Sequence, residues 1–134
     1  MGWHRYLRAY MAGIVVPTVT TFLVAPFVVW HFFRIPDTLE RAMLFPIAVN
    51  PLMWGAWNGL YTVIRRTHRV SIGWFGAALP LLLVPVGALL ARYLHISAVT
   101  PMRAAAVLPP TMLAYYVIWR YVVAFLNGVV GLGA

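Results

Sequence analysis

Four long apolar runs constrain the fold of this chain more than any other feature of its sequence. A helix of about 20 consecutive apolar residues is long enough to cross the hydrocarbon core of a bilayer. The runs cover Tyr10–Phe33, Met43–Ile64, Val70–Ala91 and Ala104–Trp119. Three of them exceed this length, and the fourth does so if it continues through Arg120 towards Leu126.

The amount of apolar surface excludes a soluble fold. The chain has 134 residues, of which 63% are hydrophobic and 9% are charged. A domain of this size leaves much of its surface exposed, so its interior has no room for so many apolar side chains. We therefore predict an all-α integral membrane protein, in which residues 1–134 form one domain of four transmembrane helices.

The charged residues are mostly arginines near the ends of the apolar runs. Ten arginines and no lysine are opposed by two acids, Asp37 and Glu40, and the formal net charge is +8. Arginine at the ends of membrane helices is typical of contact with anionic lipid headgroups. We therefore predict the lipid bilayer and these headgroups as partners, and no nucleic acid. Because the chain has no cysteine, disulfides and thiolate metal sites are excluded.

The distribution of arginines over the loops predicts the orientation. Five arginines lie in the N-terminal segment and in residues 65–69, against four in the other two loops. This small excess favours both termini in the cytoplasm. The first run is too long for a signal peptide and lacks a small-residue cleavage site, so we expect it to stay attached. The predicted location is an inner or plasma membrane.

A faint internal repeat relates the two halves of the chain. The pair His4-Arg5 recurs as His68-Arg69, and His31 recurs as His95, all at an offset of 64 residues. Two readings remain open, a duplicated two-helix hairpin or a chance similarity of helix ends. Two spans return the chain to its starting side, so a true duplication gives a parallel repeat about an axis along the membrane normal.

The stretch Phe45–Tyr61 departs most from a plain lipid-facing helix. At about 100° per residue, its polar and aromatic side chains fall on one helical face. These are Asn50, Trp54, Trp57, Asn58 and Tyr61. Beside them, Gly55 and Gly59 form a GxxxG step, which another helix can approach closely. We therefore expect one side of this helix to meet protein.

Small residues also mark packing positions in the first and third runs. Gly13 belongs to a series of small residues at every fourth position of the first run, and Ala77 to a similar set in the third. Small side chains let membrane helices approach closely. We predict Gly13, Gly55, Gly59 and Ala77 as residues at which helices pack.

Arg120 interrupts the apolar sequence near the end of the fourth run. By the repeat offset it lies at the depth of Asn58 on the other hairpin. Arg120, Asn50 and Asn58 are therefore the candidate polar cluster within the membrane. Alternatively, if the helix ends near Leu126, the guanidinium extends to the interface and acts as an anchor.

The sequence lacks the patterns of catalysis and of cofactor binding. It contains no HExxH or GxSxG motif and no pair of carboxylates within the apolar runs. His4 and His31 are 27 residues apart. This corresponds to about 40 Å of helix, so both lie at or beyond the bilayer edge instead of around a haem. We predict no enzyme activity, no cofactor and no metal.

Three hypotheses for function follow from these observations. The leading one is a small non-enzymatic membrane subunit, which works as an oligomer or with other membrane subunits. The first alternative is a transporter or channel for an anionic or amphipathic solute, with Arg120, Asn50 and Asn58 as its polar lining. The second alternative is a haem- or quinone-binding membrane subunit.

Overall fold

The computed structural model describes residues 3–32, 45–95 and 100–132, and these ranges are helical apart from short turns, without strands. The prediction of an all-α protein is confirmed for this part of the chain. Asp37 and Glu40 lie outside it. In chain order the segments are α1 (Trp3–Phe32), η1 (Phe45–Val49), α3 (Asn50–Ile64), α4 (Ile72–Ala78), α5 (Pro80–Tyr93), α6 (Pro101–Ile118), η2 (Trp119–Val123) and α7 (Ala124–Val129), where η denotes a π-helix.

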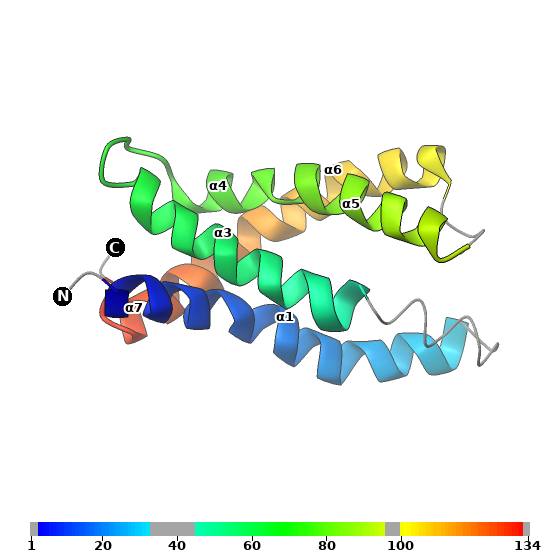
Figure 1. The fold of residues 1–134 in the computed structure, drawn as a ribbon, viewed down its shortest axis with the longest axis horizontal. Coiled ribbons are helices and arrows are strands. Elements are labelled where there is room, and N and C mark those ends of the chain that lie inside the picture. Colours follow the sequence, from blue (N-terminus) through cyan, green and yellow to red (C-terminus); the bar gives the residue numbers. More distant parts are fainter. Residues whose placement is uncertain (1–2, 33–44, 96–99, 133–134) are drawn as a thin grey trace.

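These segments join into four long helices that lie side by side (Figure 1). η1 continues into α3, and α6 continues through η2 into α7. α4 and α5 are separated at Leu79 because Pro80 has no N–H to continue the ladder, and the Leu79 N–H donates to the Gly76 carbonyl at 3.0 Å. The start of α1, the end of α7 and the turn between α3 and α4 lie at one end of the bundle (Figure 1).

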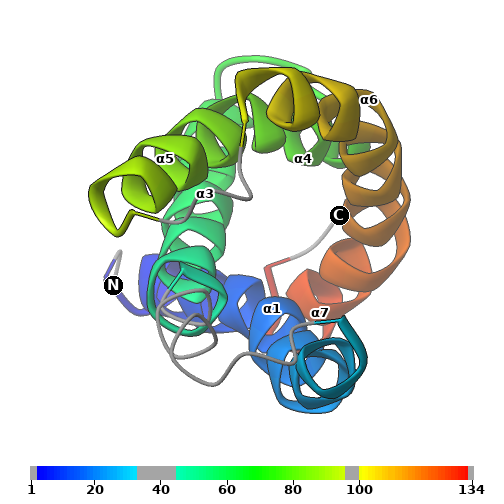
Figure 2. The ribbon, with the colours of Figure 1, turned by 90° about the vertical axis from the view of Figure 1, so that its right-hand side faces the viewer.

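Seen along its long axis, the bundle is a ring of helices (Figure 2). α1 packs chiefly against α3, and α4 and α5 pack against α6. The chain therefore forms two helical hairpins. The apolar core lies where they meet, and its buried members are Trp54, Leu79, Leu83, Trp119 and Val123.

Within the described ranges, three helices are long and apolar enough to cross a membrane. They are Trp3–Leu23, Ile72–Tyr93 and Pro101–Val129. The helix formed by η1 and α3 is not among them, because its asparagines and tryptophans lower its mean hydropathy. Membrane character is thus supported by three helices, and the fourth crossing stays a prediction.

The fourth helix extends past Leu126, where the shorter reading of the sequence ended it. It ends in a Schellman motif, in which Gly131 has a φ of 71° and the Leu132 N–H donates to the Asn127 carbonyl at 2.8 Å. The Arg8 guanidinium donates to the Val130 carbonyl at 2.9 Å. Arginine is favourable at this negative end of the helix dipole, so this contact fastens the end of α7 to the start of α1.

Candidate functional site

Two buried asparagines from different hairpins bond to each other inside the bundle. Asn58 on α3 donates to the Asn127 side-chain oxygen at 2.8 Å, and Asn127 on α7 donates back at 3.0 Å. Asn58 also donates to the Ala9 carbonyl of α1 at 2.7 Å. Asn58 is 0% exposed and Asn127 is 3% exposed. A buried amide is costly unless its hydrogen bonds are made, and this pair makes them reciprocally.

Aromatic side chains also join α3 to the other hairpin. The Trp54 indole N–H donates to the Tyr115 hydroxyl at 3.1 Å, and the ring centroids of Trp54 and Trp119 are 5.4 Å apart. The Trp57 indole N–H donates to the Phe75 carbonyl at 2.8 Å. The polar and aromatic face predicted for Phe45–Tyr61 therefore meets protein, as the helical periodicity indicated.

Arg120 does not join Asn58, and the predicted three-residue cluster does not form within this chain. Trp119, Val123 and Asn127 are buried at four-residue intervals, and Arg120 follows Trp119 by one position, so it is exposed on the outer side of η2. Arg120 lies nine residues before Val129, about 14 Å along the helix. The described residues offer its guanidinium no hydrogen bond, ion pair or ring contact.

The third member of the predicted cluster, Asn50, lies at the start of α3. Its side-chain oxygen is buried and is hydrogen-bonded by no described residue, and the same holds for the indole N–H of Trp119. Both residues adjoin a π-helical segment, since η1 ends at Val49 and η2 begins at Trp119. π-helical turns shift the register of the backbone ladder and are frequent at functional sites. The two groups supply one hydrogen-bond acceptor and one donor, and neither carries a charge.

The four predicted packing residues have different surroundings. An added Cβ on Gly13 would lie 2.6 Å from the Trp54 carbonyl oxygen, and one on Gly55 would lie 2.7 Å from the Tyr10 ring. Ala77 is 3% exposed. A Cβ on Gly59, in contrast, would meet no atom within 4 Å. Within this chain the GxxxG step therefore packs at Gly55, while Gly59 faces open space.

Sequence reasoning missed two packing residues. Asn127 was not singled out because it stands alone in an apolar and glycine-rich tail. Only its spacing, four residues after Val123 and eight after Trp119, could have placed it on the inner face. Gly76 was also missed, although an added Cβ there would clash with the Trp119 side chain. Asn127 bonds to Asn58 of the first hairpin, and Gly76 packs against Trp119. The periodicity of a single helix does not indicate partners on other helices.

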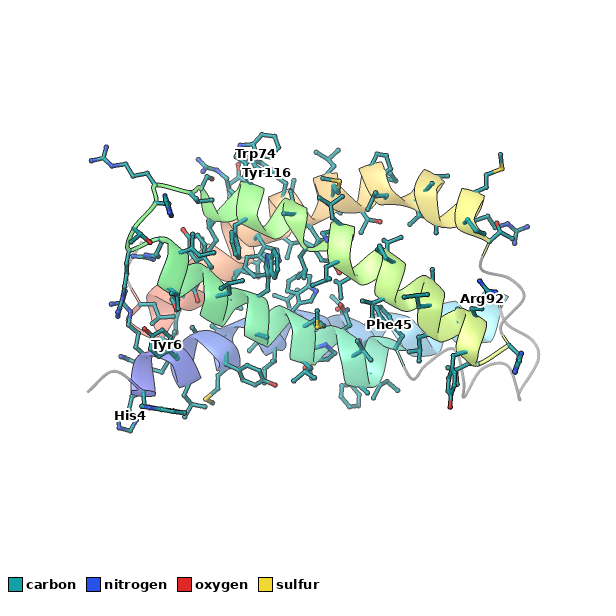
Figure 3. The ribbon with its side chains drawn as sticks, turned by 45° about the horizontal axis from the view of Figure 1, so that its top comes forward. His4, Tyr6, Phe45, Trp74, Arg92 and Tyr116 are labelled. Atoms are coloured by element: carbon teal, nitrogen blue, oxygen red, sulfur yellow. The ribbon has the colours of Figure 1, made fainter. Side chains whose placement is uncertain are left out.

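Basic side chains gather where α1 begins and α3 ends. His4, Arg5 and Arg8 come from the first turns of α1, and Arg65, Arg66, His68 and Arg69 come from the turn after α3. Arg66 lies over the Tyr6 ring, 5.7 Å from its centroid, in cation–π geometry. His4 and Tyr6 are at this basic end, and Arg92 is at the opposite end (Figure 3).

In the part of the chain that the structure describes, no three side chains of the types that bind metals come together. His4 is in the first turn of α1, His68 is in the turn after α3, and His95 follows α5. The end of α5 lies at the other end of the bundle from the start of α1 (Figure 1). No family model, curated protein or solved structure matches this chain. Its function must therefore be argued from the bundle itself.

Proposed function

We propose that this protein is a small non-enzymatic membrane subunit with four spans, which works as an oligomer or within a larger membrane complex. The observation that carries this proposal is the uncovered surface of the last helix. α6 has no buried residue, and its continuation in η2 presents Arg120 outward. Most large side chains on this surface are apolar, so Arg120 stands out as a charge without a partner in the described chain.

The distribution of side chains around α3 supports the fourth crossing. η1 and α3 together are about 30 Å long, the thickness of a bilayer core. The polar groups of this helix point inward, where Asn58 bonds to the other helices. Its exposed large side chains are apolar, namely Ile47, Leu52, Leu60 and Val63. Mean hydropathy ignores which side faces lipid, so it undervalues a helix of this kind.

A recurring glycine–tryptophan contact supports the parallel repeat. In the first hairpin Gly13 of α1 packs against the Trp54 carbonyl oxygen of α3, and in the second Gly76 of α4 packs against the Trp119 side chain of η2. The offsets, 63 and 65 residues, are close to the offset of 64 between the histidine pairs. Each hairpin is thus closed by a first-helix glycine against a second-helix tryptophan.

The charge of Arg120 explains why an outside partner is expected. Guanidinium stays protonated at any accessible pH, so deprotonation cannot relieve the cost of placing it against lipid tails. A carboxylate or carbonyl of a neighbouring subunit compensates this charge. The planar guanidinium of Arg120 suits a bidentate contact with a carboxylate. Tyr116, one turn before Arg120, packs against the exposed Trp74 of α4, with ring centroids 5.0 Å apart (Figure 3).

Substitutions of Arg120 test this proposal. We expect Arg120→Leu to lower the assembled fraction about tenfold or more, because a hydrogen bond to a charged group contributes roughly 1.5–3 kcal/mol. Arg120→Lys keeps the charge but not the fork, so its effect should be intermediate. The measurement is native mass spectrometry of particles extracted from membranes in mild detergent. Arg92→Lys and Arg92→Leu at the opposite end are the matched controls.

The other hypotheses gain no specific support. The transport alternative needs Arg120, Asn50 and Asn58 to line one path, whereas Arg120 is on the outside and Asn58 is bonded to Asn127.

If all Arg120 variants assemble like the wild type, the Arg120 side chain is an interfacial anchor and the proposed assembly surface is wrong.

A further inference from the structure

Arg5 and Arg66 lie at the basic end and have no acidic counterpart among the described residues. Arg8 is engaged by the carbonyls of His4 and Val130. The Nε of Arg5, in contrast, is buried and receives no hydrogen-bond acceptor from any described residue. None of the described residues is acidic, and the chain's two acids both fall in residues 33–44. An acceptor for Arg5 must therefore come from elsewhere.

The positions of the neighbouring side chains direct Arg5 and Arg66 to the same region. Arg5 precedes Ala9 by one helical turn, and the Ala9 carbonyl accepts from Asn58, so Arg5 lies on the α1 face that meets α3. Arg66 follows the end of α3 and rests over Tyr6, the residue next to Arg5. The Tyr6 ring thus holds the Arg66 guanidinium beside the start of α1, and the Arg5 side chain extends from the same turn of α1.

We propose that Arg5 and Arg66 form a binding site for a phosphate group, with an anionic phospholipid headgroup as its source. This inference rests on the proposed membrane location, because the basic end then lies at the depth of lipid phosphates. Phosphate oxygens match the planar donors of guanidinium in charge and geometry. They supply acceptors for the guanidinium groups of Arg5 and Arg66, and they offset the repulsion between neighbouring cations.

Lipid retention by purified variants tests this site. The probe is phosphatidylglycerol in nanodiscs that also contain phosphatidylcholine, and bound lipid is counted by native mass spectrometry after release. We expect Arg5→Gln and Arg66→Gln to lower phosphatidylglycerol retention about tenfold. Arg92→Gln removes the same charge at the other end and should leave retention within about twofold of the wild type. Equal losses in all three variants would overturn the site, because they would indicate general charge attraction.

Two further measurements complete the test. The first separates a lipid headgroup from free phosphate as the ligand, and the second controls for misfolding. Inorganic phosphate added at increasing concentration should not displace phosphatidylglycerol, and displacement would identify the site as one for free phosphate. Tyr6→Leu removes the platform for Arg66 without changing the charge, so it should lower retention, whereas Tyr6→Phe should not. Wild-type retention in Tyr6→Leu and in both arginine variants would overturn the proposal. Lipid retention is measured per chain and does not depend on how many chains a particle holds. The lipid site can therefore be confirmed even if the proposed assembly through Arg120 is wrong.

Discussion

Valine in place of Gly13 should separate α1 from α3, while valine in place of Gly59 should leave the bundle unchanged. An added Cβ at Gly13 would lie 2.6 Å from the Trp54 carbonyl oxygen and 2.9 Å from the Gly55 Cα. Both are backbone atoms, so a rotamer change cannot relieve the clash. Overpacking of this kind costs roughly 1–3 kcal/mol and more where the backbone must move.

The Gly59 variant is a matched control for the Gly13 variant. Both replace a helical glycine by the same β-branched residue, so their helix-propensity costs are similar. The free energy of unfolding in mixed detergent micelles, followed by circular dichroism, gives the comparison. Equal midpoints for Gly13→Val and Gly59→Val would mean that α1 and α3 do not approach closely in the membrane.

The buried amide pair should give a strongly non-additive double-mutant cycle. Asn58→Ala leaves the Asn127 amide buried without its partner, and Asn127→Ala does the reverse to Asn58. Each substitution should cost about 1–3 kcal/mol, or nearer 0.6–2 kcal/mol where membrane helices find other partners. The double variant should cost less than the sum, with a coupling of about 0.5–2 kcal/mol, because the second substitution removes an amide that is already unsatisfied.

Asn50 supplies the control for that cycle. It lies two helical turns before Asn58 and shares none of the hydrogen-bond partners of Asn58, so Asn50→Ala should be additive with Asn58→Ala in the unfolding assay. Additive costs for Asn58→Ala and Asn127→Ala would instead mean that the two amides do not bond to each other.

The sequence predicted the helices and one inner face well, for a physical reason. In a bilayer the backbone N–H and C=O groups must form hydrogen bonds within their own segment, so long apolar runs form helices. The face with Asn50, Trp54, Asn58 and Tyr61 was visible because polar groups in such a helix must turn towards protein. These features depend only on order along a single segment.

The contacts between helices could not be predicted in the same way. The offset of 64 residues put Arg120 opposite Asn58, whereas the bundle pairs Asn58 with Asn127. The inner face of the last helix is set by Trp119 and Val123 in η2, and Trp119 follows Trp54 by 65 residues instead of 64, so Arg120 does not take the place that the offset of 64 gave it. The length of that helix was open because it depends on Gly131 at positive φ and on a bond from Arg8, far away in the sequence.

Four membrane crossings underlie every proposal above, and single-cysteine labelling tests them most directly. The native chain has no cysteine, so His4→Cys, His68→Cys and Met102→Cys each introduce one label site. All three positions are exposed, the first two at the basic end and Met102 at the start of α6. The reagent is a membrane-impermeant maleimide, applied to intact cells and again after permeabilisation.

Four crossings place positions 4 and 68 on the same side of the membrane; with both termini in the cytoplasm, His4→Cys and His68→Cys are protected in intact cells, while Met102→Cys reacts. If Phe45–Ile64 did not cross, the chain would span the membrane only once between positions 4 and 68, and these two sites would lie on opposite sides. Labelling of one but not the other would therefore contradict the four-span bundle, whereas protection of both with reaction at Met102→Cys is the result that it predicts.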